Sequence, residues 1–221
     1  MQNGKGSKKR PTNLKKFLKN WDDIDWSKLA KKDKMEYFIK KTQRVLFCDV
    51  DGVLNDFDWF KSDHYQYLKR HTPLKNGDLK DNRGQFCKCY GALHLNPMSI
   101  VLLNEIIQQT GCKVVISSTW RRIFTLEEIV GMLVDRGLQK TYVSNFIGMT
   151  PILDQQAGPL FTAPVRGNEI QAWMESHGVK QNQVCILDDD ADMVHLSHRL
   201  VRVMGLNTEN TEAVIKMLTA D

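Results

Sequence analysis

The sequence of 221 residues contains no apolar run near the length of about 18 residues that a membrane-spanning helix needs, and its first residues lack the apolar centre of a signal peptide. We therefore expect a soluble, intracellular protein of the cytoplasm that does not contact membranes. Cysteine is scarce and odd in number, with five residues, of which Cys48 and Cys185 lie in apolar segments. This usage favours reduced thiols over a disulfide framework, with Cys48 packed in the interior.

Acidic residues are absent from the first twenty positions, which hold seven Lys or Arg. Residues 1–44 carry fourteen basic and five acidic residues, net +9, whereas the remainder carries seventeen and twenty-one, net −4. Such a basic segment attracts nucleic acid by neutralising phosphates, although a solvated tail that only aids solubility is an equal alternative. Apolar spacing predicts short helices at residues 13–20 and 28–41. We expect a basic, partly helical extension over 1–43 and one α/β domain over 44–221.

Two carboxylates follow the first apolar segment of the domain. Val45–Cys48 has the continuous apolar pattern of a strand buried on both faces. Asp49 and Asp51 lie two positions apart, so an extended backbone directs both to the same side, and Gly52 allows a sharp turn. Two clustered anions repel each other and favour a cation such as Mg²⁺. Taken alone, this pattern of two aspartates and a glycine occurs in ordinary turns about as often as in such cation sites.

Two later apolar segments also end in polar residues. The segment that starts at Lys113 ends in Ser117 and Ser118, and the segment 184–187 is followed by three consecutive aspartates. Between them, Arg166 opens a helical pattern. Because open α/β sheets bind ligands at the carboxyl ends of their strands, we expect these side chains to converge near the first two acids.

Strand and helix patterns alternate after the first strand, as in parallel α/β folds. Asn96 and Pro97 begin a predicted helix that Gly111 ends, and Thr125 with Glu128 forms a capping box for the next helix. The remaining expected elements are strands at 141–147, 184–187 and 200–204 and helices at 169–176 and 211–218.

The order of acid pair, hydroxyls, base and acid cluster resembles the four motifs of the haloacid dehalogenase (HAD) superfamily of phosphatases, over about residues 44–205. The resemblance implies a Rossmann-like, doubly wound parallel sheet of five strands in the order 5-4-1-2-3, with Asp49 on the central strand. Segments 96–98, 117–121 and 166–170 look like those of polynucleotide 3′-phosphatases and of phosphatase domains in RNA-repair proteins. The chain has no kinase P-loop.

In the chemistry that this resemblance implies, Asp49 attacks phosphorus to form an aspartyl-phosphate, and Asp51 protonates the leaving oxygen and later activates water. Ser117 binds the phosphoryl group and Arg166 stabilises its charge, although the superfamily usually supplies lysine there and Lys180 is the other candidate. The implied Mg²⁺ ligands are Asp49, the backbone carbonyl of Asp51, and one or both of Asp188 and Asp189. The further substrate contacts are Gly52, Ser118, Arg121 and Asn168.

Residues 55–95 form an insertion that reads as a loop and is too short for a large cap domain, which predicts an open site suited to a polynucleotide end. Zinc is a minor alternative for its ligand-type residues, which lack paired spacing: His64, His71, Cys87, Cys89 and His94. The leading function is a Mg²⁺-dependent phosphatase of nucleic-acid repair that acts on polynucleotide 3′-phosphates. The alternatives are a 5′-nucleotidase for free (deoxy)nucleoside monophosphates and a nucleic-acid-binding protein with a vestigial catalytic domain.

Overall fold

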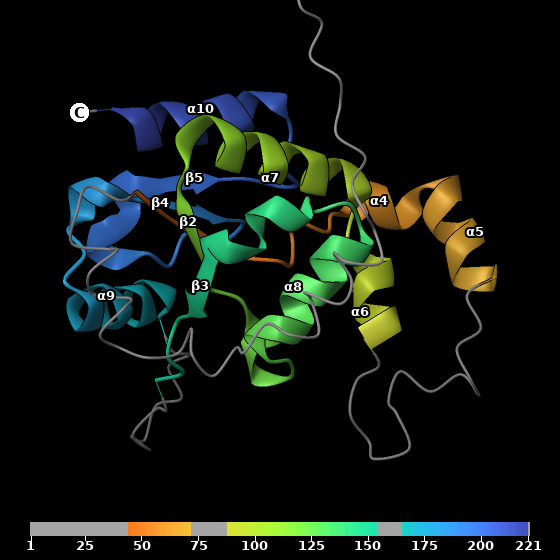
Figure 1. The fold of residues 1–221 in the computed structure, drawn as a ribbon, viewed down its shortest axis with the longest axis horizontal. Helices are drawn as coiled ribbons and strands as arrows, with labels where there is room; N and C mark the ends of the chain where they lie inside the picture. Colours follow the sequence, from red (N-terminus) through yellow and green to blue (C-terminus); the bar gives the residue numbers. More distant parts are fainter. Residues whose placement is uncertain (1–43, 72–87, 154–164, 221) are drawn as a thin grey trace, which may run out of the picture.

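A parallel sheet of five strands forms the centre of the protein (Figure 1). The computed structural model describes residues 44–71, 88–153 and 165–220, so the two helices predicted before residue 44 lie outside the described residues. The strand order β3-β2-β1-β4-β5 is the order that the resemblance implied, and Asp49 directly follows the central strand. The strands are β1 Val45–Cys48, β2 Lys113–Ile116, β3 Phe146–Met149, β4 Val184–Asp188 and β5 Leu200–Arg202.

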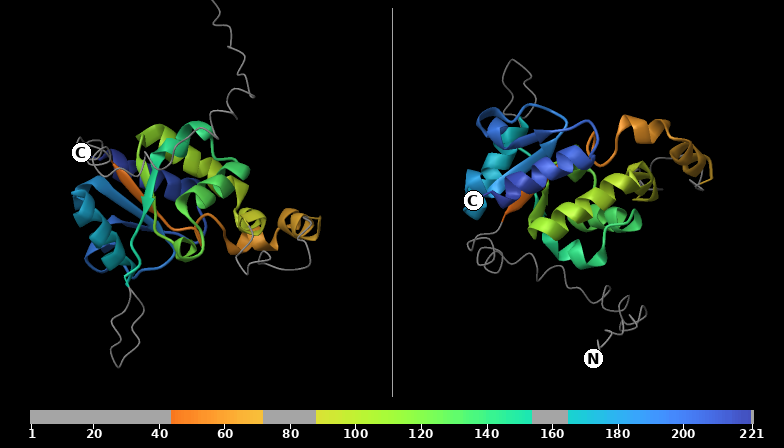
Figure 2. Two further views of the ribbon diagram at one scale, coloured as in Figure 1. Left: turned by 60° about the horizontal axis from the view of Figure 1, so that its bottom comes forward. Right: turned by 90° about the horizontal axis from the view of Figure 1, so that it is seen from above.

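Helices cover both faces of this sheet, which makes the fold doubly wound (Figures 1 and 2). One face packs against α7 (Pro97–Thr110), α8 (Leu126–Asp135) and α10 (Thr208–Thr219). The other face packs against α9 (Arg166–His177) and the 3₁₀ helix η5 (Val194–Arg199). The predicted α/β fold class is therefore confirmed.

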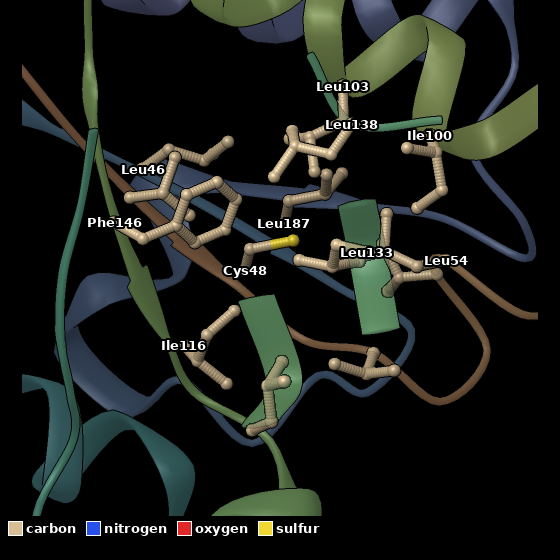
Figure 3. Close-up of a cluster of buried hydrophobic side chains, with 14 of the residues drawn as sticks. Leu46, Cys48, Leu54, Ile100, Leu103, Ile116, Leu133, Leu138, Phe146 and Leu187 are labelled. Atoms are coloured by element: carbon tan, nitrogen blue, oxygen red, sulfur yellow. The ribbon is translucent and has the colours of Figure 1, made fainter. Parts of the chain in front are cut away.

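The central strand is apolar at every position because each face has its own core. Leu46 and Cys48 belong to the core under α7, α8 and α10, whereas Val45 and Phe47 belong to the core under α9. Figure 3 shows Cys48 among the side chains of the first core. Burial raises the pKa of this thiol well above its ordinary value. Cys48 thus packs in the interior, as expected, although it adjoins Asp49 in sequence.

The predicted helix ends are largely confirmed by their caps. The Asn96 side chain accepts from the backbone N–H of Met98 at 3.0 Å, and Gly111 ends α7 in the left-handed conformation. Thr125 and Glu128 form both bonds of the capping box of α8. Helices α9 and α10 each start three residues earlier than expected.

The expected strand at 141–147 is wrong over most of its length. Residues Lys140–Asn145 form the 3₁₀ helix η3, and β3 begins only at Phe146. Val143 and Phe146, three residues apart, are both buried in the core, which matches the three-residue period of a 3₁₀ helix better than alternation along a strand. The Asn145 side chain donates to the Cys112 carbonyl at 2.8 Å and fixes this turn beside β2.

The described parts of the insertion are largely helical, so the expectation of a loop-like segment is wrong for these parts. They contain α4 (Phe57–Lys61), α5 (Asp63–His71) and α6 (Lys88–His94). The Asp56 side chain caps α4 by accepting from the Trp59 N–H at 2.7 Å. Trp59 packs with Tyr65 and Leu93 in a small separate cluster, and α4 and α5 lie at one end of the molecule (Figure 2). The described part of the insertion is thus a small helical unit with its own apolar cluster.

No helix within the described ranges is long and apolar enough to cross a membrane. His195 and His198 lie exposed on η5. The zinc alternative also requires Cys87 and Cys89, whose side chains lie outside the part of the chain that the structure describes.

Candidate active site

The polar residues that follow strands β1, β2 and β4 lie at the same edge of the sheet. The backbone N–H of Asp49 donates to the Leu187 carbonyl at 2.9 Å, and the N–H of Ser117 donates to the Cys48 carbonyl at 2.9 Å. These bonds continue the parallel ladders one residue beyond the strands. Asp49 therefore lies between the end of β2 and the end of β4, where sequence reasoning expected the motifs to meet.

Three carboxylates form a compact acidic cluster at this edge. Asp49, Asp188 and Asp189 offer oxygens that all lie within 4.8 Å of one another. Asp49 Oδ1 accepts from the Val50 N–H at 2.8 Å and Asp188 Oδ1 accepts from the Asp190 N–H at 3.0 Å. Asp188 Oδ2 is buried and has no hydrogen-bond partner among the described residues. A buried carboxylate oxygen that accepts no hydrogen bond and lies beside two other acids fits a hard divalent cation such as Mg²⁺, which prefers oxygen ligands.

The electrostatics of this cluster point the same way. Burial raises the pKa of Asp49 to about 6, against the lowering effect of the Arg166 guanidinium. Burial and the neighbouring Asp49 raise the pKa of Asp188 to about 7, and burial also raises the pKa of Asp189. Without a cation the cluster therefore holds protons that ordinary carboxyls would lose. A bound divalent cation favours the ionised forms and makes Asp49 available as an anion.

Gly52 is a glycine because the backbone passes directly against Asp189. Its φ is +70°, and a Cβ at this position would lie 2.2 Å from Asp189 Oδ2. The Gly52 N–H donates to Asn55 Oδ1 at 2.9 Å, and its carbonyl accepts from the Gly205 N–H at 2.7 Å. The structure thus gives Gly52 a role in shaping the acidic cluster, and its contact with substrate stays a prediction.

Gly52→Ala should displace Asp189 and weaken Mg²⁺ binding. The left-handed φ costs about 1–2 kcal/mol for a residue with a Cβ, and the clash adds to that cost. We expect a lower melting temperature and the loss of the increase that Mg²⁺ produces, both measured by thermal unfolding with and without the ion. Gly111→Ala is the matched control, because its φ is +62° and its Cβ would meet nothing within 4 Å. If both variants keep the full Mg²⁺ response, Gly52 does not shape the cluster.

The two serines after β2 are buried beside Asp49. Ser118 partly offsets the rise in the pKa of the Asp49 carboxyl that burial causes. Ser117 Oγ accepts from the Thr150 hydroxyl at 3.3 Å. Thr150 follows β3, and its backbone N–H donates to the Ile116 carbonyl at 3.0 Å, so a hydroxyl from a third strand end supports the predicted phosphoryl contact. Sequence reasoning missed Thr150 because the start of β3 was misplaced.

The base of the third motif lies in the same site. Arg166 Nη1 donates to the Ser117 carbonyl at 2.6 Å, and Arg166 Nε lies 3.8 Å from Asp188 Oδ2. Lys180 precedes the 3₁₀ helix η4 (Gln181–Gln183) at the amino end of β4, on the opposite edge of the sheet. Of the two basic residues that the sequence offered, the structure brings only Arg166 to the acidic cluster.

Asp192 lies in the loop between β4 and η5 and contacts the start of α9. Its Oδ2 accepts from the backbone N–H of Arg166 at 2.9 Å, the first residue of α9. Gly167 permits this approach, since a Cβ there would lie 2.3 Å from the Met193 carbonyl oxygen. Asp192 therefore holds the start of α9, and with it Arg166, against the loop after β4.

The carboxylate of Asp51 lies outside the acidic cluster and is held by other groups. It accepts hydrogen bonds from Asn55, Thr119 and Trp120. Thr119 and Trp120 belong to the 3₁₀ helix η2 (Thr119–Arg122), which directly follows Ser118. The proposed acid and base of the reaction is thus oriented by the second motif.

A family described as the HAD domain in Swiss Army Knife RNA repair proteins matches residues 45–210. The chain belongs to this family. Among solved structures, a haloacid dehalogenase-like hydrolase from Streptococcus pneumoniae is similar to the chain at 15% identity and a TM-score of 0.37, covering 78% of this chain and 91% of that chain. No curated protein matches it. The protein is a hydrolase of the HAD superfamily, which confirms the resemblance seen in the sequence.

Arg121 is buried beside this HAD site. Its guanidinium forms a buried ion pair with Glu169 of α9 and donates to the Ser118 carbonyl. The Arg121 side chain is almost fully enclosed, and its contact with substrate stays a prediction. Its ion pair braces the second motif against α9. Asn168, in the first turn of α9, is exposed, and its contact with substrate stays a prediction.

Proposed function

We propose that this HAD hydrolase is a Mg²⁺-dependent phosphomonoesterase that removes phosphate from polynucleotide ends through an aspartyl-phosphate on Asp49. The observation that carries the proposal is the arrangement around Asp49. This carboxylate directly follows the central strand, within one cluster with Asp188 and Asp189, and next to Ser117, Ser118 and Arg166. A nucleophile, a metal site and a cationic donor thus meet at one edge of the sheet.

The reaction takes two steps. A carboxylate oxygen of Asp49 forms a bond to phosphorus while the bond from phosphorus to the leaving oxygen breaks, and Asp51 gives its proton to that oxygen. Asp51 then takes a proton from water, whose oxygen attacks phosphorus and returns the electron pair of the broken bond to Asp49. Mg²⁺ held by Asp49, Asp188 and Asp189, with the Asp51 carbonyl, would neutralise charge between these acids and the phosphate.

Arg166 and Ser117 serve the phosphoryl group during both steps. Arg166 is fixed by its bond to the Ser117 carbonyl and by its proximity to Asp188, so its charge is placed before substrate binds. A charge placed in advance stabilises the transition state without reorganisation at the moment of reaction. The Ser117 hydroxyl, supported by Thr150, offers a donor from the neighbouring strand end.

Arg166→Ala should lower kcat about a hundredfold or more, which is the scale for removing one charge stabiliser placed in advance. Lys180→Ala is the matched control, because this exposed residue lies at the opposite edge of the sheet. Steady-state kinetics of phosphate release by both variants check this expectation. A larger loss in Lys180→Ala than in Arg166→Ala would show that the third motif has been misplaced.

Three observations support a polynucleotide substrate. The matching family occurs in RNA repair proteins, residues 1–44 carry net +9, and the described part of the insertion is a small helical unit rather than a large cap. A basic segment increases affinity for a polyanion much more than for a mononucleotide. The nucleotidase alternative would leave this charge without a use.

Phosphate release from a panel of substrates tests the proposal. The panel contains RNA and DNA oligomers with 3′- or 5′-phosphate, nucleoside monophosphates and an aryl phosphate, each with and without Mg²⁺. We expect the 3′-phosphorylated oligomers to be the best substrates, with EDTA abolishing activity. Deletion of residues 1–20 should raise KM for oligomers and leave the aryl phosphate unchanged. Faster turnover of mononucleotides, unaffected by the deletion, would establish the nucleotidase instead.

A further inference from the structure

The carboxylate of Asp51 is held by three donors that come from two segments of the chain. Asn55 Nδ2 and Trp120 Nε1 each donate to Oδ1 at 2.9 Å. The Thr119 hydroxyl lies 3.2 Å from Oδ2. A carboxylate oxygen has two lone pairs, so the two N–H groups occupy both lone pairs of Oδ1.

Neither of these N–H donors can become an acceptor. The indole nitrogen of Trp120 is a donor only. The Asn55 amide is fixed in its orientation, because its own oxygen accepts from the Gly52 N–H at 2.9 Å. The Thr119 hydroxyl, in contrast, can rotate and act as donor or acceptor. The proton that Asp51 carries must therefore lie on Oδ2, the oxygen whose partner adapts to it.

Trp120 is itself held in place by the interior. Its side chain is 7% exposed, and its ring lies 5.6 Å from the Phe124 ring. A Cβ at Gly91 of α6 would lie 3.5 Å from Trp120 Cζ3, so α6 passes close to the ring. Burial and the neighbouring Phe124 thus hold the tryptophan that contacts Asp51.

We propose that Trp120 is a positioning residue for proton transfer by Asp51, and that it acts with Asn55 to fix the proton on Oδ2. The inference rests on the proposed phosphomonoesterase reaction. In the first step, the leaving oxygen takes the Oδ2 proton together with the electron pair of the broken bond to phosphorus. The carboxylate that remains keeps both N–H bonds on Oδ1 and is ready to accept a proton from water on Oδ2.

A comparison of two leaving groups tests this role. An alkyl phosphate needs the proton because its alkoxide leaves poorly, whereas 4-nitrophenyl phosphate releases a stable anion. Values of kcat/KM cover the steps up to formation of the aspartyl-phosphate, so the later activation of water does not enter the comparison. Trp120→Phe should lower kcat/KM for the alkyl phosphate about tenfold to a hundredfold, part of the usual gain from general acid catalysis, and for the aryl phosphate less than about threefold.

Trp173→Phe is the matched control. Trp173 is 4% exposed and packs edge-on against Phe47 in the core on the other face of the sheet. Its replacement should lower the melting temperature about as much as Trp120→Phe and leave the ratio of the two kcat/KM values at the wild-type level. Thr119→Val, at an exposed position, is a second variant that should change the ratio in the same direction as Trp120→Phe.

The outcomes separate this inference from the proposed function. If the wild-type protein releases phosphate from neither ester and from none of the phosphorylated oligomers, the phosphomonoesterase reaction is wrong and the role of Trp120 falls with it. If it hydrolyses both, and Trp120→Phe and Thr119→Val leave the ratio unchanged, the function stands and the positioning role is wrong. A changed ratio in Trp173→Phe as well would show a general effect of packing and would also overturn the role.

Discussion

Asp49→Asn should abolish phosphate release, with a loss of at least about a thousandfold, as is typical for removal of a covalent nucleophile. Asparagine has the shape of aspartate but is neutral, and its amide oxygen cannot form the phosphoryl ester. The fold should persist because the Oδ1 bond from the Val50 N–H can still form. Metal-free stability should not fall, since the change removes a carboxyl whose pKa burial raises to about 6. Phosphate release and thermal unfolding measure the two effects.

Mass spectrometry after acid quench provides a second measure of the nucleophile. Wild-type protein mixed with substrate should carry a phosphoryl group on the peptide that contains Asp49, and the variant should carry none. Asp135→Asn is the matched control, because Asp135 is an exposed carboxylate at the end of α8, and it should behave as wild type. A tenth of wild-type turnover in Asp49→Asn, or a phosphoryl group on another residue, would exclude Asp49 as the nucleophile.

The parts of this site that sequence alone predicted are those encoded by local pattern. The apolar run of β1 followed by Asp49, Asp51 and Gly52 fixes a buried strand, two acids on one side and a turn, all within eight residues. The strand order came from the resemblance to the HAD superfamily, and the sheet agrees with it. Caps such as Asn96 and the box of α8 are also local, because their hydrogen bonds span two or three residues.

The parts that sequence missed depend on contacts between distant segments. Asp51 and Trp120 are 69 residues apart, and nothing in either motif predicts the bond between them. Trp120 and Arg121 are neighbours, yet one bonds Asp51 and the other pairs with Glu169, because the 3₁₀ geometry of η2 turns successive side chains in different directions. The resemblance implied a substrate contact for Arg121, and no local pattern predicts its ion pair with Glu169, which lies 48 residues away in the sequence.

The acidic cluster should make the stability of the metal-free protein depend on pH in an unusual direction. Burial raises the pKa of Asp49 to about 6 and that of Asp188 to about 7. In the unfolded chain the same carboxyls release their protons at about pH 4. Between these values the folded state binds more protons than the unfolded state, so the contribution of the two groups to stability is full below about pH 4 and is lost as pH rises through about 7.

Mg²⁺ should reverse this loss, because ligands must release their protons to bind the ion. At pH 8 a concentration of one hundred times Kd should stabilise the protein by about 2.7 kcal/mol, and at pH 5 the same concentration should have little effect. Thermal unfolding at several pH values, with Mg²⁺ or EDTA, measures both trends. Calorimetric titration of Mg²⁺ in buffers of different ionisation heat measures the released protons.

Asp188→Asn combined with Asp189→Asn should remove these effects together. The double variant loses two of the three clustered carboxylates, so we expect no heat of Mg²⁺ binding, no Mg²⁺-dependent rise in melting temperature, a weaker pH dependence of metal-free stability, and no detectable phosphate release. Asp190→Asn is the matched control, because Asp190 is exposed, lies in the same loop and does not belong to the cluster. Full activity of the double variant in EDTA would show that the cluster does not hold a catalytic metal. If Asp190→Asn lost the Mg²⁺ response as fully as the double variant, the ion would instead bind elsewhere in the loop after β4. Only the cluster joins Asp188 and Asp189 to the carboxylate of Asp49, which follows the central strand.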